Sequence, residues 1–223
     1  MTDPGVDGDR KRGPATEFPL DRFNAFSDGV FAIAITLLVL ELPVPKGPEP
    51  LLPTLVEQWP EFLGYLISFA FIGGMWFGHA RMTRLMKRGD SLAAGINLLV
   101  LLFVAVLPFT TSLMVSHLSG PDVGVAVLIY GINGLSASLL LTILMAHLVR
   151  ERTLLVDDVA DETLAALTRQ RQVSTVVWIV AVLCALVAPL VSVGLYVVAT
   201  ILMLALPFLH AGRNRRRGSS PRS

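Results

Sequence analysis

Apolar runs recur along most of this chain, and each approaches the roughly 20 residues that span the hydrocarbon core of a bilayer. Hydrophobic residues make up 53% of the chain and charged residues 16%, well below the roughly 25% charged of soluble domains. The longest connection between runs, residues 150–172, has room for one helix at most. The sequence therefore predicts an all-α, polytopic membrane protein with six transmembrane helices. The predicted spans are Phe23–Leu42, Phe62–Met82, Leu92–Val115, Val123–Val149, Val173–Val191 and Val193–His210.

Basic residues are distributed unevenly between the connections. An even number of spans alternates the connections between two sides, and the first, third and fifth connections hold only Lys46. By the positive-inside rule the arginine-rich side is the cytoplasm, so we expect both termini to be cytoplasmic. These clusters flank membrane spans, so we interpret them as topology signals and contacts to lipid headgroups, with no nucleic acid as a partner.

The remaining segments are short. Residues 1–18 and the basic residues 213–223 lack apolar periodicity and are predicted to be disordered tails. They enclose a six-helix membrane domain over residues 19–212. Within the fourth connection, Asp161 suits the start of a short amphipathic helix on the cytoplasmic surface, ending near Arg171.

Two further signals lie inside the spans. Pro108 in the third span predicts a kink. Gly74 and Gly78 in the second span have the spacing of a close helix approach, and they are equally compatible with ordinary small residues of a membrane helix.

The first span carries polar groups as well as a regular aliphatic pattern. Arg22 and Asp28 open it, and ionisable groups at lipid depth usually face a protein interior or a water-filled path. At about 100° per residue, Ile33, Leu37 and Leu40 share one stripe that Thr36 borders, and Asp28 points about 140° away from Ile33. The stripe can face lipid, pack a core, or line something that several subunits share.

The opposite directions of the first two spans bring Asp28 and His79 to a similar depth, next to Arg81. Such a cluster offsets the cost of burying each charge, so we expect Asp28 and His79 to be in contact. It can serve as a structural hydrogen bond or as part of a proton relay. The pair lacks the further ligands that a metal site needs, and the sequence has no TVGYG-like filter, P-loop or HExxH motif. We therefore expect no enzyme, no metal site and no cofactor.

The segment from Arg22 through Phe26, Ser27, Asp28 and Gly29, continuing as VFAIAITLLVLEL, closely resembles the first-helix signature of the transmembrane protein 175 family. The second span adds the Trp-x-x-His pattern of Trp76 and His79. The resemblance implies a potassium-permeable channel. It also implies the bacterial form, which has one six-helix unit per chain, assembles as a homotetramer and lies in the plasma membrane.

The same resemblance assigns residues to roles. It implies that Ile33, Leu37 and Leu40 of each first helix form a hydrophobic pore constriction, with Thr36 at the hydroxyl position beside it. Polar residues are implied to hold the helices together at the cytoplasmic side; they are Arg22, Ser27, Asp28, Trp76 and His79. A proton-coupled secondary transporter using Asp28 and His79 is the alternative, and a non-transporting scaffold is a third. The sequence has no inverted repeat, which argues against the transporter.

Overall fold

The computed structural model describes the backbone of residues 19–217 and the side chains through residue 204. Every named element is a helix, as the apolar patterning predicts. The α-helices are α1 (Leu20–Leu37), α2 (Leu51–Glu57), α3 (Trp59–Thr83), α4 (Ser91–Ser116), α5 (Val123–Arg150), α6 (Asp161–Ala185) and α7 (Pro189–Arg217), and the short 3₁₀ helices are η1 (Leu38–Glu41) and η2 (Arg152–Leu154). Residues 1–18 and 218–223, part of the predicted tails, lie outside the described residues.

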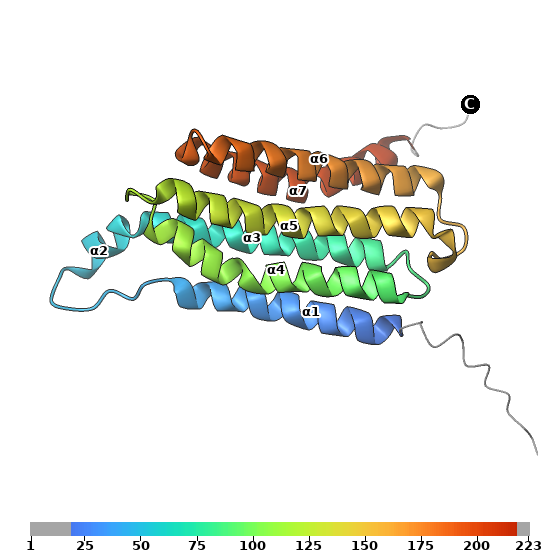
Figure 1. Ribbon diagram of the computed structural model, residues 1–223, viewed down its shortest axis with the longest axis horizontal. Helices are drawn as coiled ribbons and strands as arrows, with labels where there is room; N and C mark the ends of the chain where they lie inside the picture. The colour runs from blue at the N-terminus through green and yellow to red at the C-terminus, as the bar shows by residue number, and fades with distance from the viewer. Residues whose placement is uncertain (1–18, 218–223) are drawn as a thin grey trace, which may run out of the picture.

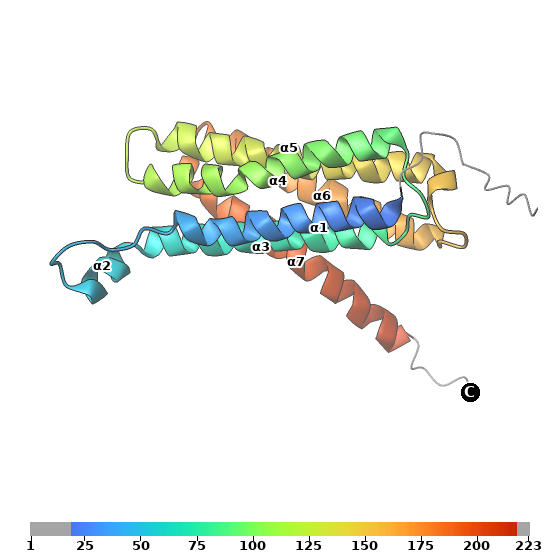
Figure 2. The same ribbon diagram turned by 90° about the horizontal axis from the view of Figure 1, so that it is seen from below.

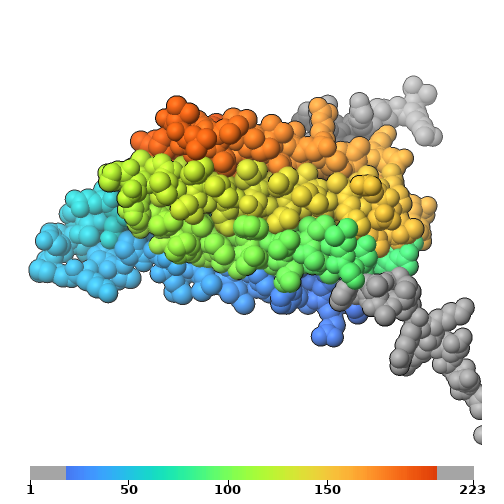
Figure 3. Space-filling view, in the orientation of Figure 1, coloured from blue at the N-terminus to red at the C-terminus, as the bar shows by residue number. Residues whose placement is uncertain are grey.

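The long helices run along a common axis as a bundle (Figure 1). Their connections gather at two ends. The end where α1 begins and α3 stops is called the basic end here, because most of the arginines and Lys87 lie in or next to the connections there. The short helix α2 lies at the opposite end. Helix α1 lies along one edge of the bundle (Figure 3), and the last part of α7 diverges from the other helices (Figure 2).

Among the described residues, four helical segments are long and apolar enough to cross a membrane: Leu20–Glu41, Trp59–Thr83, Ser91–Ser116 and Val123–Arg150. They match the first four predicted spans to within three residues at each end. The boundary between the fifth and sixth spans was predicted wrongly, between Val191 and Val193. In the structure α6 ends at Ala185 and α7 begins at Pro189. Proline favours the first position of a helix, where its missing N–H leaves no bond unmade, and this signal marks the true boundary.

The predicted surface helix is not separate from the fifth span. It forms the first turns of α6, which runs unbroken from Asp161 to Ala185. Asp161 is the first residue of that helix, and its carboxylate pairs with Arg152 at 2.7 Å. Helix α7 continues to Arg217, so it includes the first residues of the segment that we expected to be a C-terminal tail.

An aromatic cluster forms the centre of the bundle where α3, α5, α6 and α7 meet. Trp178 packs against Phe71 with ring centroids 4.6 Å apart and stacks on Tyr196 at 5.0 Å. Gly134 provides the space for the Trp178 ring, because a Cβ at this position would collide with the indole. Large aromatic side chains bury extensive apolar surface, so this cluster fixes the relative positions of four helices.

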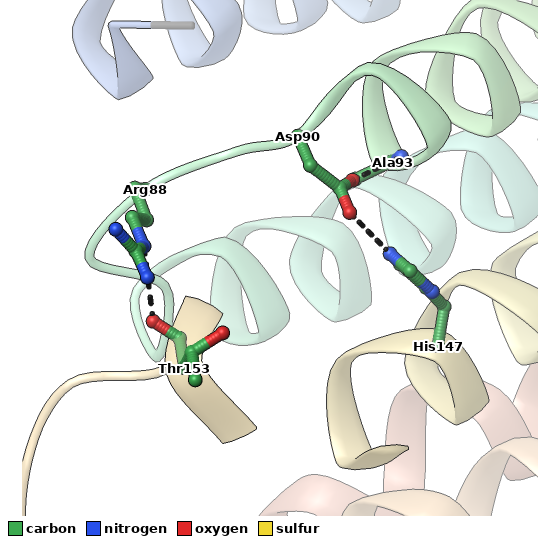
Figure 4. A network of polar contacts seen from close by, with 5 residues as sticks. All are labelled: Arg88, Asp90, Ala93, His147 and Thr153. Carbon is green, nitrogen blue, oxygen red and sulfur yellow. Dashed lines mark hydrogen bonds and ion pairs between the residues drawn. The ribbon is translucent and has the colours of Figure 1, made fainter. Parts of the chain in front are cut away.

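Specific polar contacts tie the helices together at the basic end (Figure 4). Asp90 precedes α4 and accepts a hydrogen bond from the backbone N–H of Ala93 at 2.8 Å and one from His147 of α5 at 2.9 Å. Partial burial raises the pKa of Asp90, but these two donors outweigh it and hold that pKa below its ordinary value. In the same connection, between α3 and α4, Arg88 donates to the carbonyl of Thr153 in η2 at 3.2 Å.

Candidate functional site

Helix α1 and the η1 turn that follows it have two apolar faces, one buried against the bundle and one exposed. Phe31, Ala34 and Leu38 are almost completely buried against the bundle. On the other face Ile33, Leu37 and Leu40 keep 60%, 41% and 74% of their surface exposed. The predicted stripe is therefore a real face of the helix, and the single chain leaves it uncovered. We call these three residues with Thr36 the open face of α1.

After Leu37 the chain changes from an α-helix to the tighter 3₁₀ helix η1, and this change keeps Leu40 on the open face. In an α-helix, residues three apart are rotated by about 60° from each other, whereas in a 3₁₀ helix they eclipse. Because Leu38–Glu41 is 3₁₀, Leu40 stays nearly in line with Leu37. The regular α-helix assumed from the sequence did not include this local tightening.

The hydroxyl of Thr36 donates its proton to backbone carbonyls of its own helix. Its hydroxyl donates to the carbonyl oxygens of Ala32 at 3.0 Å and Ile33 at 2.9 Å. A hydroxyl has one donor and two acceptor lone pairs, so donation to the helix leaves the exposed Thr36 oxygen able to act as an acceptor. It is the polar atom of the open face.

Asp28 contacts the second predicted span through Trp76 and not through the expected His79. The indole N–H of Trp76 donates to its carboxylate at 2.8 Å. The Trp76 ring also packs against Phe77, with centroids 5.0 Å apart. This bond crosses from α1 to α3 near the basic end, and it is more exposed than the neighbouring network of His79.

His79 belongs to a buried chain of polar groups that links three helices. The hydroxyl of Ser27 donates to the Phe23 carbonyl at 2.9 Å and accepts from the amide nitrogen of Asn97 at 2.9 Å. The amide oxygen of Asn97 then faces Nε2 of His79 at 2.8 Å. An amide oxygen only accepts, so Nε2 must carry the proton. The imidazole also lies between the rings of Phe23 and Phe31.

The predicted contact between Asp28 and His79 is therefore replaced by two separate links. Each residue has a non-titrating partner, Trp76 for the aspartate and Asn97 for the histidine, and the carboxylate acts on the imidazole only through space. Arg22 is exposed on α1, away from the buried chain. Sequence reasoning missed Asn97, although a lone amide inside the apolar segment GINLLVLL is itself a signal for a buried polar contact.

Within the described residues, no group of three or more His, Cys, Asp and Glu side chains is placed to hold a metal ion. The polar chemistry of this region consists of hydrogen bonds between helices. The open face of α1 lies beside it and is almost purely aliphatic.

Comparison with known proteins points to one family. A sequence model described as "Endosomal/lysosomal potassium channel TMEM175" matches residues 22–108. A potassium channel of Chamaesiphon minutus is 35% identical over 81% of this chain and 91% of its own length. The chain belongs to the TMEM175 family. A potassium channel of Streptomyces collinus is 40% identical over 67% of this chain and 74% of its own length.

A solved structure extends the similarity to the whole TMEM175 fold. The crystal structure of a TMEM175 homologue from Chamaesiphon minutus, described as a lysosomal potassium-selective channel homologue, has a TM-score of 0.76 and 34% identity. The match covers 83% of this chain and 96% of that chain. Residues 22–108, which the TMEM175 sequence model matches, include the open face of α1, the Asp28–Trp76 bond and the whole Ser27–Asn97–His79 chain.

Proposed function

We propose that this protein is the subunit of a potassium-permeable channel, in which potassium moves passively down its electrochemical gradient. The observation that carries the proposal is the open face of α1, where large aliphatic side chains are exposed although the opposite face of the same helix is buried. The potassium channels to which the chain is similar support the choice of ion.

One pore-lining helix cannot enclose a path by itself, so several copies must surround the axis. Closed cyclic symmetry is the usual solution for identical subunits, and family resemblance favours a homotetramer. Four copies of the open face then produce stacked rings of Ile33, Leu37 and Leu40. The expected mass in lipid nanodiscs is that of four chains, and a stable monomer or dimer that still conducts would contradict this arrangement.

The rings control conduction by hydration. An ion inside an aliphatic ring loses water without gaining polar contacts, and a narrow ring of this kind can lose its water and close. The acceptor oxygen of Thr36 lies between Ile33 and Leu37 in the sequence, where it can replace part of the lost hydration. Selectivity in this arrangement comes from the cost of removing water, without a filter of backbone carbonyls.

The same proposal includes topology and location. Helices α6 and α7 serve as the fifth and sixth spans, and the basic end faces the cytoplasm, in agreement with the positive-inside rule. The chain then lies as a multi-pass protein in the plasma membrane of a bacterium. Its partners are potassium ions, the bilayer and further copies of itself.

The arrangement of Asp28 and His79 favours a channel over proton-coupled transport. A relay passes protons between titrating groups, but the direct partners of these two residues are the indole of Trp76 and the amide of Asn97. Neither partner takes up and releases protons at physiological pH.

The decisive experiment is potassium flux from liposomes loaded with the purified protein, measured with the proton gradient collapsed. We expect flux to continue, with Ile33→Asn and Leu37→Asn raising it and lowering the preference for potassium over sodium. Phe31→Ala on the buried face is the control, and it should reduce thermal stability without changing ion preference. Unchanged conduction and selectivity in folded Ile33→Asn and Leu37→Asn proteins would remove α1 from the pore, and flux that requires a proton gradient would favour the transporter.

A further inference from the structure

A buried arginine on α6 reaches across to α3. Arg171 has only 7% of its surface exposed, and its guanidinium group lies directly against the backbone of Gly78. A Cβ atom at Gly78 would overlap that group. The second glycine of the predicted GxxxG spacing therefore makes room for a charged side chain, whereas Gly74 lies close to Met203 of α7, as near helix contact requires.

No negative charge compensates this arginine in the described part of the chain. The charge that acts on it is that of Arg81, which is also positive. Arg81 lies three residues after Gly78, hence on the same face of α3, and its Nη1 atom is buried without a hydrogen-bond partner. Burying a charge without an opposite charge or a hydrogen bond is costly. A buried Arg171 side chain next to an Arg81 with a buried, unpaired nitrogen therefore favours an anion beside the two guanidinium groups.

Two buried hydroxyl groups on α6 also lack hydrogen-bond partners. Thr168 and Ser174 lie three residues before and after Arg171, so they share its helix face. The Oγ1 of Thr168 and the Oγ of Ser174 are both buried and lack hydrogen-bond partners. Long side chains on a helix lean toward its N-terminus, which directs the Arg171 side chain toward Thr168 and the basic end.

We propose that Arg81, Arg171, Thr168 and Ser174 form a binding site for a phosphate group, in which the guanidinium group of Arg171 rests on Gly78. Two guanidinium forks match the several oxygens of phosphate, and its charge of nearly −2 balances theirs. The hydroxyls add further donors. A single carboxylate would leave one positive charge uncompensated.

The position of the site admits two sources of phosphate. Gly78 lies five residues before the end of α3 at Thr83, about 7.5 Å along the helix, so a phosphomonoester headgroup can reach it from the membrane surface. A soluble phosphate compound can reach it from the aqueous side of the basic end. The inference concerns α3 and α6, and it holds whether or not α1 lines a pore.

Binding is tested on the full-length protein in phosphate-free detergent by calorimetry. The probes are inorganic phosphate, a short-chain phosphatidylinositol phosphate and, as the lipid control, short-chain phosphatidylcholine. We expect at least one phosphate probe to bind. Arg171→Gln and Arg81→Gln should each weaken binding about tenfold or more, because a hydrogen bond to a charged group contributes about 1.5–3 kcal/mol. Arg84→Gln, an exposed arginine at the same helix end, should leave binding unchanged.

The probes separate the sources. Binding of inorganic phosphate supports a soluble ligand, and binding of the phosphoinositide alone supports a lipid headgroup. If Arg171→Gln does not fold, Arg81→Gln carries the test, because the more exposed Arg81 side chain is easier to replace. Absence of binding to either phosphate probe overturns the proposal, as does equal binding by the native protein and the arginine variants.

Discussion

The indole N–H of Trp76 donates a 2.8 Å hydrogen bond to the carboxylate of Asp28. This bond joins the helix with the open aliphatic face to the helix behind it. Because Asp28 binds inward to α3, it supports the position of α1 and leaves the open face without an acidic group. We therefore assign Asp28 a structural role, beside the proposed constriction and not within it.

Removing either partner of this bond should destabilise the protein while preserving ion preference. Trp76→Phe and Asp28→Ala should each lower the free energy of unfolding by about 1–2 kcal/mol, since the bond is charged but largely exposed. The double variant should lose less than the sum of the two, because both changes remove the same bond. Thermal unfolding in detergent measures this, with Trp59→Phe, an exposed indole elsewhere on α3, as the control. Strictly additive losses, or a normally assembled Asp28→Ala channel with altered ion preference, would contradict the assignment.

Asn97 should contribute more to the free energy of unfolding than its exposed neighbour Leu98 on α4. Asn97→Leu preserves most of the side-chain volume but removes the bonds to both Ser27 and His79, which leaves buried polar groups unpaired. We expect a loss of about 1–3 kcal/mol in unfolding free energy, whereas Leu98→Ala, at an exposed position, should cost much less. Chemical denaturation monitored by circular dichroism compares the two, and equal losses would show that the buried chain contributes little.

The hydroxyl of Thr36 should affect selectivity more than flux. Thr36→Val keeps the shape of the side chain and removes its acceptor oxygen, so potassium should lose part of its advantage over sodium while total conductance changes little. Thr36→Ser retains the oxygen and should behave like the native channel. Reversal potentials in bilayer recordings provide the comparison. Native selectivity in Thr36→Val would exclude the hydroxyl from the ion path.

The Asp90–His147 pair predicts a specific acid sensitivity. The folded-state pKa of Asp90 is lowered, so its stabilising contribution is fully present above the unfolded-state pKa and is lost as pH falls through the folded value. As the pH falls below about 4, the ordinary pKa of an aspartate, the melting temperature of the native protein should fall further than that of Asp90→Asn. Asparagine also caps helices well, so this variant removes the charge but retains the cap, and parallel pH profiles of the two proteins would contradict the prediction.

Hydrophobic length and spacing were sufficient to predict much of this fold. The first four spans and the shared direction of Ile33, Leu37 and Leu40 follow from the sequence because a helix has a fixed period and a bilayer a fixed thickness. Burial in the bundle could not be predicted in the same way, since it depends on which helices are neighbours. Asp28 and His79 were predicted to lie at a similar depth, but their side chains bind different neighbours, Trp76 for the aspartate and Asn97 for the histidine.

The structure of residues 161–189 was harder to predict from the sequence, because it too depends on which helices are neighbours. Residues 161–171 are amphipathic, so they suggest a helix lying on the membrane surface, but their continuation into the apolar turns after Val173 makes a single straight helix. Arg171 then becomes buried by α3, which no local pattern reveals. Pro189 was a usable signal that hydropathy alone overlooked.

The aliphatic character of the open face of α1 has a consequence for how the protein is made. A newly synthesised chain can present Ile33, Leu37 and Leu40 to acyl chains without penalty, because lipid tails are as apolar as these side chains. Insertion and bundle formation can therefore be completed before any other copy arrives. Assembly of the proposed tetramer is then a separate, later encounter between finished subunits diffusing in the bilayer, and its extent depends on how many of them the membrane contains.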